Sequence, residues 1–422
     1  MTSEASASLI QDGARVIFQR KDWSKEATVG AGKSLVISKL KIKTDEVIGL
    51  PYGTLVELNK QTGKFDRVEA VEEDDFADIE FGEAGGDNRN LVDTGTAQGL
   101  STGEIAELKI SGVKGMELIN NIVQNSSTFG DRQEYGKEKY VAKKKEKHIY
   151  RFRILRPTLR LACDVYSSMK VNKINHIRVD TLAIMLSLSN IQAGSKVLVV
   201  DGVQGLLLAA AMERTGGTGK IVHVHPGPQP IIPAYDLFGF PDSWTDTIHH
   251  LSIDNLEVVS SHVEILPKGE ESMETDGASS DGPVEPPLKK RKLNALQTAS
   301  ANYMKENTMD ALIMASRHHP KSILLFLLPF LSLSKNFVVH CAYREPLVDT
   351  FQALRGLGSV LRICLNDTAL RYYQVLPSRT HPENSMSGSG GFLLSGTTVE
   401  KGAAAVVEKE QESVPEDGKE EE

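Results

Sequence analysis

Residues 196–214 read KVLVVDGVQGLLLAAAMER, which joins a short apolar segment to a helix through a glycine-containing turn. The unbroken apolar run 197–200 is typical of a strand buried on both faces, and residues 206–214 favour a helix that Gly216-Gly217 would end. A second β-rich segment, residues 221–225, follows at once. A strand, a helix and a second strand in this order predict the opening unit of a parallel α/β sheet.

The same alternation continues towards the C-terminus and predicts a doubly wound α/β domain over residues 161–397. Just before the first strand, Asp180 can cap a helix over residues 181–190. The later predicted elements are a strand over 311–315, a helix over 322–333, a strand over 337–341, a helix over 347–355, and strands over 360–365 and 371–376. Because these last two strands lie close together in the sequence, we expect them to form a terminal hairpin.

Residues 9–100 have a different pattern. Short β-rich segments such as 15–20 and 35–42 follow one another, with turn signals at 51–53 and 61–63 and no helical periodicity between them. This pattern predicts a small antiparallel β-barrel as an N-terminal domain.

Residues 101–160 are predicted to be a helical and basic connector. Ser101 and Glu104 have the spacing of a capping box, and apolar residues then recur at helical spacing as far as Ile122. Residues 132–160 carry a net charge of +8, although the whole chain of 422 residues has a net charge of -8. Such an asymmetry is typical of a chain with one basic binding segment.

Two segments lack the apolar content needed to form a core, and we expect both to be disordered. One is the insertion 267–300, and the other is the acidic tail 398–422. Within the insertion, Lys289-Lys-Arg-Lys292 follows two prolines and has the form of a nuclear import signal, with a chance basic patch as the alternative. The sequence therefore predicts a nuclear protein.

Several classes of protein and site are not supported by the sequence. The N-terminus lacks the basic start and apolar run of a signal peptide, and the apolar stretch 323–333 is too short to span a bilayer. The three cysteines are far apart, which disfavours a disulfide framework and a cysteine zinc site. The histidine pairs 249–250 and 318–319 have no acidic or cysteine partner at ligand spacing, so no metal site is predicted.

The turn after residue 200 is where an α/β domain of this kind would hold a dinucleotide or S-adenosylmethionine. Glycines there let the backbone approach the ligand, and an acidic residue that ends the second strand holds the ribose hydroxyls. In this chain the turn reads Asp201-Gly-Val-Gln-Gly205, and the second strand ends in His225. Both features depart from what the cofactor requires.

Four short motifs give the chain a specific resemblance. They are KINHIRVD at 173–180, NSSTF at 125–129, the lysine run at 143–147, and YQVLPSRTHP at 373–382. With these motifs the chain resembles the non-catalytic subunit family of tRNA (adenine-58-N1) methyltransferase, in matching order from about residue 9 to residue 397. The resemblance implies a degenerate class I methyltransferase (Rossmann-like) domain behind the N-terminal β-barrel.

The resemblance also implies which chemistry has been lost. The catalytic sister subunit has a glycine-rich first turn preceded by an acidic residue, and Val199 stands at that acidic position. Asp201 and Val203 stand at glycine positions, where their side chains should crowd a cofactor, and only Gly205 remains. Ala315 stands where the sister has its catalytic aspartate. We therefore expect no catalytic residue and no cofactor in this chain, with S-adenosylmethionine held by the partner subunit.

The basic segment mixes cations with aromatic rings, and in RNA-binding proteins cations neutralise phosphates while rings stack on bases. From the residues alone a solvated basic linker is equally consistent, and the resemblance favours tRNA contact. The residues predicted to bind tRNA, from this segment and from three further family-matched segments, are Asp87, Asn88, Arg89, Asn90, Lys139, Tyr140, Lys143, Lys144, Lys145, Lys147, Lys173, Asn175, Arg317, Arg355 and Arg362.

The function implied is that of a non-catalytic, tRNA-binding subunit in a two-plus-two heterotetramer with the catalytic subunit. It would position the T-loop adenine for N1 methylation by that partner. One alternative is an active S-adenosylmethionine-dependent RNA methyltransferase, which cofactor binding by the isolated chain would reveal. Another is a general RNA-binding scaffold without a methyltransferase partner, which co-purification from cells would reveal.

Overall fold

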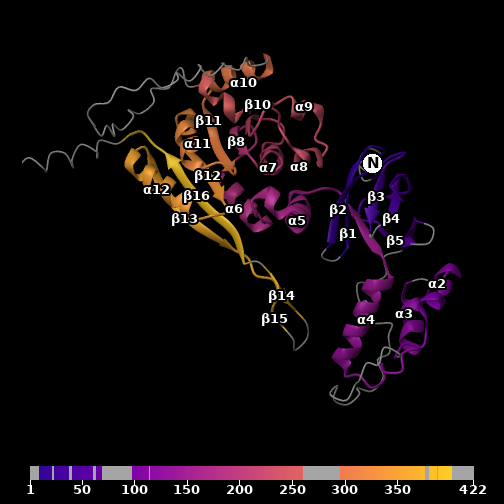
Figure 1. Ribbon diagram of the computed structural model, residues 1–422. Helices are drawn as coiled ribbons and strands as arrows, with labels where there is room; N and C mark the ends of the chain where they lie inside the picture. The colour runs from indigo at the N-terminus through magenta and orange to yellow at the C-terminus, as the bar shows by residue number, and fades with distance from the viewer. Residues whose placement is uncertain are drawn as a thin grey trace, which may run out of the picture. The chain divides into compact units, whose positions relative to one another are not determined.

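The chain forms two compact units, Met1–Pro157 and Thr158–Glu422, in a computed structural model (Figure 1). The structure describes residues 9–20, 23–37, 40–59, 63–68, 97–113, 115–259, 295–375, 380–386 and 388–401. Within these ranges no helix combines the length and apolarity needed to cross a membrane.

The described residues of the first unit form antiparallel strands and three α-helices. Its elements are β1 (Arg15–Arg20), β2 (Trp23–Thr28), β3 (Ser34–Ile37), β4 (Leu40–Lys43), η1 (Asp45–Val47), β5 (Leu55–Asn59), β6 (Lys64–Val68), α2 (Thr102–Ile110), α3 (Gly115–Gln124), α4 (Glu134–His148) and β7 (Arg151–Leu155). Five strands form an antiparallel sheet in the order β2-β1-β7-β5-β6, and β3 pairs with β4 as a hairpin. The predicted N-terminal antiparallel β-sheet domain is therefore present, whereas its closure into a β-barrel stays a prediction.

The central strand of this sheet comes from the segment predicted to be a connector. Phe152 and Ile154 of β7 are 1% and 0% exposed and belong to the same core as Val16 and Phe18 of β1. Residues 151–155 alternate apolar and polar side chains, which is the pattern of a strand with one buried face. The helices α2, α3 and α4 are therefore an insertion between β6 and β7, and the segment 101–160 is not a linker between domains.

Two of the inserted helices, α3 and α4, share a local core. The capping box at Ser101 is confirmed, because its side chain accepts from the Glu104 N–H and the Glu104 carboxylate accepts from the Ser101 N–H. Ile119, Phe129, Val141 and Ile149 pack together between α3 and α4. This packing fixes which face of α4 is buried.

The second unit is a three-layer α/β domain. Its elements are α5 (Leu159–Lys170), η3 (Val171–Ile174), α6 (Val179–Ser189), β8 (Lys196–Asp201), α7 (Leu206–Thr215), β9 (Lys220–His225), α8 (Pro233–Asp236), α9 (Asp242–Thr245), β10 (Ile248–Ser252), η4 (Ile253–Val258), α10 (Ala295–Glu306), β11 (Met309–Ala315), α11 (Pro320–Leu327), η6 (Leu328–Phe330), β12 (Leu331–Cys341), α12 (Glu345–Leu357), β13 (Val360–Ala369), β14 (Tyr373–Gln374), β15 (His381–Pro382) and β16 (Ser389–Thr398).

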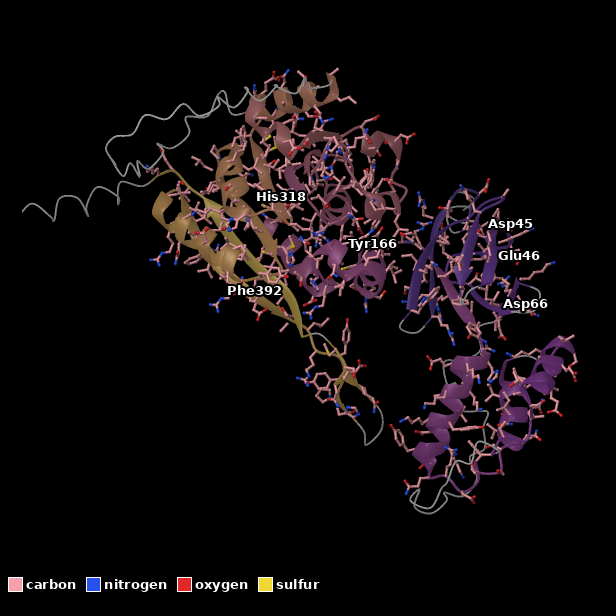
Figure 2. The ribbon with its side chains drawn as sticks, viewed as in Figure 1. Asp45, Glu46, Asp66, Tyr166, His318 and Phe392 are labelled. Carbon is pink, nitrogen blue, oxygen red and sulfur yellow. The ribbon has the colours of Figure 1, made fainter. Side chains whose placement is uncertain are left out.

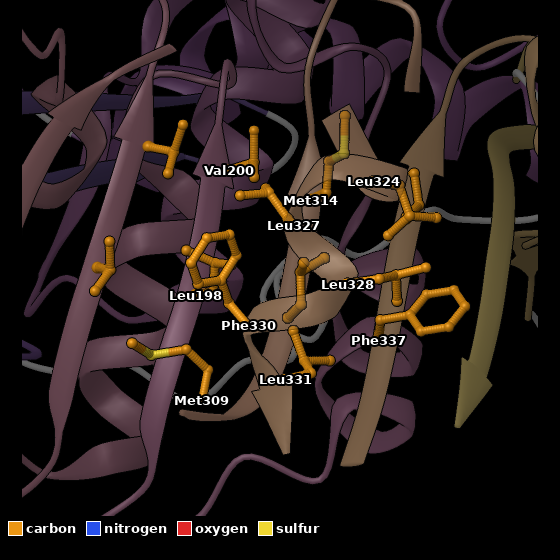
Figure 3. Close-up of a cluster of buried hydrophobic side chains, with 14 of the residues drawn as sticks. Leu198, Val200, Met309, Met314, Leu324, Leu327, Leu328, Phe330, Leu331 and Phe337 are labelled. Atoms are coloured by element: carbon orange, nitrogen blue, oxygen red, sulfur yellow. The ribbon is translucent and has the colours of Figure 1, made fainter. Parts of the chain in front are cut away.

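Its seven-stranded sheet has the order β10-β9-β8-β11-β12-β16-β13. The five strands from β10 to β12 are parallel, and β16 is antiparallel to both of its neighbours. Helices α5, α6 and α7 pack together on one face, and α10, α11 and α12 cover the other. Figure 3 shows the core beneath the second group, where Val200 of β8 lies near Leu327 of α11 and Leu198 lies near Phe330.

The predicted terminal hairpin is wrong in its pairing. The partner of β13 is β16, whose residues Ser389–Thr398 lie between β12 and β13 in the sheet. Within the segment predicted as the second hairpin strand, Tyr373 and Gln374 instead pair with β15, and Figure 1 shows β14 and β15 extending beyond the end of the sheet. Sequence proximity misled the prediction because antiparallel partners need not be consecutive.

Three local predictions also need correction. Helix α11 ends at Leu327 and strand β12 begins at Leu331, because Pro329 cannot continue an α-helix. Asp180 does not cap α6, since the N-cap residue is Arg178, whose guanidinium binds the Asp180 carboxylate at 3.0 and 2.9 Å. Residues 295–300, assigned to the disordered insertion, begin α10, which buries Ala301 and Met304 against the sheet.

Candidate functional site

The turn between β8 and α7 is occupied by a side chain of the chain itself. The Asp201 carboxylate accepts hydrogen bonds from the backbone N–H groups of Val203 at 2.7 Å, Gly205 at 3.1 Å and Leu208 at 3.0 Å. N–H groups at the start of a helix lack partners within the helix and are a ready binding site for an anionic ligand. Here Asp201 uses three of these donors.

Asp201 is 4% exposed, so the carboxylate has little contact with water. Burial raises the pKa of Asp201, and the hydrogen bonds from the N–H groups of Leu208, Val203 and Gly205 oppose that rise. The side chain is therefore a structural part of the turn, because it satisfies backbone donors that would otherwise be buried without a partner.

The glycines that remain in the turn are needed for packing within the chain. Gly205 has a φ of +81°, and a Cβ atom there would lie 2.8 Å from Cα of Ile232. A Cβ atom on Gly202 would lie 3.1 Å from Cα of Ser316. Val203 is fully buried. The backbone of the turn is thus pressed against two other segments of the domain.

The second strand ends among histidines where the cofactor would need a carboxylate. The ring of His225 is 1% exposed and lies 5.5 Å from the ring of His223 and 6.2 Å from that of His250, measured between ring centroids. Nδ1 of His223 is 2.9 Å from Nδ1 of His250, so one of the two nitrogens donates. Burial, together with His225 and His249, lowers the pKa of His250 to about 4. Neutral imidazoles fill this corner of the domain.

The remaining two positions also carry no suitable group. Val199 is fully buried within β8, and Ala315, which is also fully buried, is aligned with Asp201 at the end of β11. A methyl group at residue 315 has no polar atom with which to bind or activate a substrate. The residues present therefore do not fit S-adenosylmethionine, because Asp201 uses the donors of the turn and β9 ends in His225 where a carboxylate would hold the ribose.

The basic segment forms helix α4, and its lysines differ in exposure. Lys139, Lys143 and Lys147 are exposed and follow one another at four-residue spacing, so they form a row on one face of the helix. We call these three residues the lysine row. On the opposite face Val141 is fully buried, while Lys144 and Lys145 are half-buried.

Tyr140 is engaged within the first unit. Its hydroxyl donates to Oε1 of Gln98 at 3.0 Å, and its ring lies 5.6 Å from that of Phe129. Cations from Arg132 and Lys144 each lie 5.0 Å from the centre of the ring. The ring therefore packs against its neighbours, and the geometry does not support the predicted stacking on a base.

A second group of predicted residues meets in a cavity of about 560 Å³ in the second unit. Asn175 and Arg317 both line it, although they are far apart in the sequence, and Lys173 is an exposed neighbour in η3. His176 and Tyr343, which were not among the residues predicted from the sequence, also line this cavity. The position of Tyr343 directly after β12 could have indicated this, because residues that follow parallel strands gather at the carboxyl edge of the sheet.

The other predicted residues do not join this group. Arg355 is exposed in the last turn of α12, and Arg362 is exposed in β13 at an irregularity of the ladder, with a φ of 54°. Asp87, Asn88, Arg89 and Asn90 lie outside the described residues, as do Lys289 to Lys292. The roles assigned to all of them remain predictions.

Comparison with known proteins gives consistent matches. Residues 9–291 match the Gcd10p family. A mouse protein named tRNA (adenine(58)-N(1))-methyltransferase non-catalytic subunit is 35% identical, over 92% of this chain and 88% of its own length. A protein of the same name from Dictyostelium discoideum is 28% identical, over 94% of this chain and 81% of its own length.

Among solved structures, an S-adenosylmethionine-dependent O-methyltransferase from Thermotoga maritima has a TM-score of 0.51 with 13% sequence identity. The match covers 94% of this chain and 96% of that one. At this level of identity the likeness concerns the fold alone, and it agrees with the predicted methyltransferase-like α/β architecture.

Proposed function

The chain belongs to the Gcd10p family as a non-catalytic subunit of the tRNA (adenine(58)-N(1))-methyltransferase complex, and from this premise we propose that it holds tRNA on helix α4. The catalytic partner subunit would transfer the methyl group to the T-loop adenine that the complex positions. The observation that carries this proposal is the lysine row, Lys139, Lys143 and Lys147.

The geometry of α4 suits contact with a polyanion. A four-residue step along an α-helix advances about 6 Å, so the lysine row presents cations at regular intervals along one line. Each lysine that neutralises a phosphate releases bound counterions, which makes binding favourable and salt-dependent. The opposite face is held by Val141 and by Lys137, whose Nζ lies 5.9 Å from the centre of the Phe129 ring. The fixed helix limits the conformational entropy that binding would cost.

We further propose that this chain does not bind S-adenosylmethionine and that the cofactor belongs to the catalytic partner. The support is the turn after β8, where the Asp201 carboxylate already accepts from three backbone N–H groups. The absence of a functional group at Ala315 argues in the same direction and against an active methyltransferase in this chain.

The assembly and the location are proposals that rest on the family and on the sequence. A two-plus-two heterotetramer with the catalytic subunit is the arrangement that the family resemblance implies. Nuclear location is supported by Lys289-Lys-Arg-Lys292 alone. A general RNA-binding scaffold without this partner is disfavoured because the relatives are named as subunits of one enzyme.

The proposal is tested with the complex of the full chain and its catalytic partner. One variant replaces the lysine row by alanine, and a matched control replaces Lys33, Lys41 and Lys43, which are exposed in and beside the β3–β4 hairpin and carry the same charge. We expect the slope of log affinity for tRNA against log salt to become shallower by about two to three for the lysine-row variant. The control should change the slope much less.

Steady-state methylation of tRNA by the same two complexes provides a second readout. Loss of binding energy that is equal in the ground and transition states raises KM and leaves kcat nearly unchanged. An unchanged salt slope and an unchanged KM for the lysine-row variant would contradict a role of α4 in holding tRNA. Gel filtration establishes that both variants still assemble.

A further inference from the structure

The cavity of about 560 Å³ lies at the carboxyl edge of the parallel strands, within the second unit. Its walls come from the turn around residues 172–176, the loop 316–320 after β11, and the loop 341–346 after β12. In open α/β sheets ligands bind in the crevice outside the carboxyl ends of the strands. The nearby turn after β8 is filled by the Asp201 side chain, and among the described residues the cavity is one part of this edge that remains open to a ligand.

The lining of the cavity favours an anion. Arg317 lines it with His318 and His319, and none of the lining residues is acidic (Figure 2 labels His318). One terminal nitrogen of the Arg317 guanidinium donates to the backbone oxygen of Asn172 at 2.5 Å, which fixes the direction of the side chain. The other donors of this guanidinium have no further partner among the described residues. A planar cation held in this way is suited to a phosphate.

The rim of the cavity carries an aromatic ring. Tyr343 lines the cavity and is 69% exposed, which is unusual for a large aromatic side chain. RNA-binding proteins recognise unpaired nucleotides by stacking the base on an aromatic ring and by hydrogen bonds to its edges. Asn172 and Asn175 also line the cavity, and their side chains carry amide groups that can form such hydrogen bonds. Its volume is typical of a site for a small molecule and is far too small for a duplex.

The backbone beside the cavity is held in an unfavourable conformation. Asn175 and His176 are consecutive non-glycine residues with φ values of 50° and 62°, in the left-handed region. Few non-glycine residues adopt this region, although asparagine and histidine do so more often than most, and such residues often occur at ligand-binding sites. The turn places His176 on the surface and Asn175 in the wall, where it is 8% exposed.

We propose that this cavity binds one unpaired nucleotide of the bound tRNA, with a phosphate on Arg317 and the base against Tyr343. The inference rests on the proposed function, because it assumes that the chain contacts tRNA. It adds a specific site at which a single nucleotide is held apart from its neighbours. Asp201 fills the turn after β8, and the neighbouring cavity serves the RNA.

The test uses the complex with the catalytic partner and full-length tRNA. Removal of an aromatic ring on which one base stacks lowers the affinity roughly five- to hundredfold. We therefore expect Tyr343→Ala to weaken tRNA binding within this range, while Tyr343→Phe, which keeps the ring, stays within about twofold of the wild type. Equal losses for Tyr343→Ala and Tyr343→Phe would overturn the stacking role.

The phosphate contact has its own readout and control. Arg317→Ala should reduce the slope of log affinity against log salt by about one. The control is Arg214→Ala, because Arg214 is exposed in the last turn of α7, which runs back to the opposite edge of the sheet. Wild-type affinity and slope for both Arg317→Ala and Tyr343→Ala would overturn the inference. Circular dichroism and thermal unfolding establish that each variant is folded.

Two further arms separate this inference from its alternatives. If the lysine-row variant loses tRNA affinity and the cavity variants do not, the proposed function stands and the nucleotide site is wrong. If none of the variants changes tRNA binding, the proposed function itself fails.

In a second experiment, adenosine and cytidine 5′-monophosphate are titrated into the tRNA-free complex. Micromolar binding of either one, lost in Arg317→Ala while tRNA affinity is unchanged, would assign the cavity to a free nucleotide instead.

Discussion

Replacing Asp201 by alanine should destabilise the second unit substantially. The change removes the acceptor for the N–H groups of Val203, Gly205 and Leu208 and leaves these buried donors without a partner. A buried unsatisfied donor costs about 1–3 kcal/mol, and partial relaxation or entry of water recovers some of this cost. We therefore expect the free energy of unfolding to fall by about 3–5 kcal/mol. Asp201→Asn, which keeps one acceptor oxygen, should lose roughly half as much.

The assay can be confined to the second unit because the chain has two tryptophans, Trp23 in the first unit and Trp244 in the second. In a Trp23→Phe background, fluorescence during urea unfolding reports the surroundings of Trp244. Glu213→Ala is a matched control, since Glu213 is an exposed carboxylate in the same helix α7. A change below about 0.5 kcal/mol for Asp201→Ala, similar to a neutral surface substitution, would refute the structural role of this carboxylate.

The pH dependence of the same variants tests the electrostatics of the turn. Burial raises the pKa of Asp201 in the folded chain above the ordinary value of 3.8. The folded state therefore binds the proton more tightly than the unfolded state, and the corresponding stability is lost as pH rises from about 4 through the raised folded pKa. Over this range the wild type should lose stability relative to Asp201→Asn, which has no carboxyl group to titrate. If the wild type instead gained stability relative to Asp201→Asn as pH rises, the hydrogen bonds from the N–H groups would lower the pKa of Asp201 more than burial raises it.

Three other predictions concern the closed turn and the location of the protein. Gly205→Ala should lower the free energy of unfolding by about 2 kcal/mol or more, measured in urea, because its Cβ atom would lie 2.8 Å from Cα of Ile232 at a φ of +81°. Isothermal calorimetry of the isolated chain with S-adenosylmethionine should give no binding heat, and one-to-one micromolar binding would contradict the proposed loss of the cofactor site. Alanine at Lys289 to Lys292 should reduce nuclear accumulation in imaging while the purified complex still methylates tRNA; unchanged imaging would reject the import signal unless the partner carries the complex in.

The sequence by itself determined the features that depend on neighbouring residues. The strand, turn and helix over residues 196–214 were predictable because apolar runs and glycine caps act locally. The capping box at Ser101 was predictable for the same reason. The resemblance to the family rests on short motifs, and such motifs can be recognised in the sequence without knowledge of their contacts in the structure.

Strand pairing was decided by the tertiary structure. Residues 151–155 become the centre of the first sheet only because β1 and β5 arrive on either side of them. Similarly, β16 separates β12 from β13 in the second sheet. Partners far apart in the chain gain their hydrogen bonds only after a loop is closed, so a local pattern does not specify them.

The direction of individual side chains was also decided at the tertiary level. The sequence placed Asp201 at a glycine position, but only the fold directs its carboxylate onto the N–H groups at the start of α7. Lys143 and Lys144 are adjacent in the sequence, yet one is exposed and the other lies beside the Tyr140 ring. Arg317 and Tyr343 line one cavity because parallel strands bring their carboxyl ends to a common edge, a proximity that comes from the order of the strands in the sheet and not from sequence spacing.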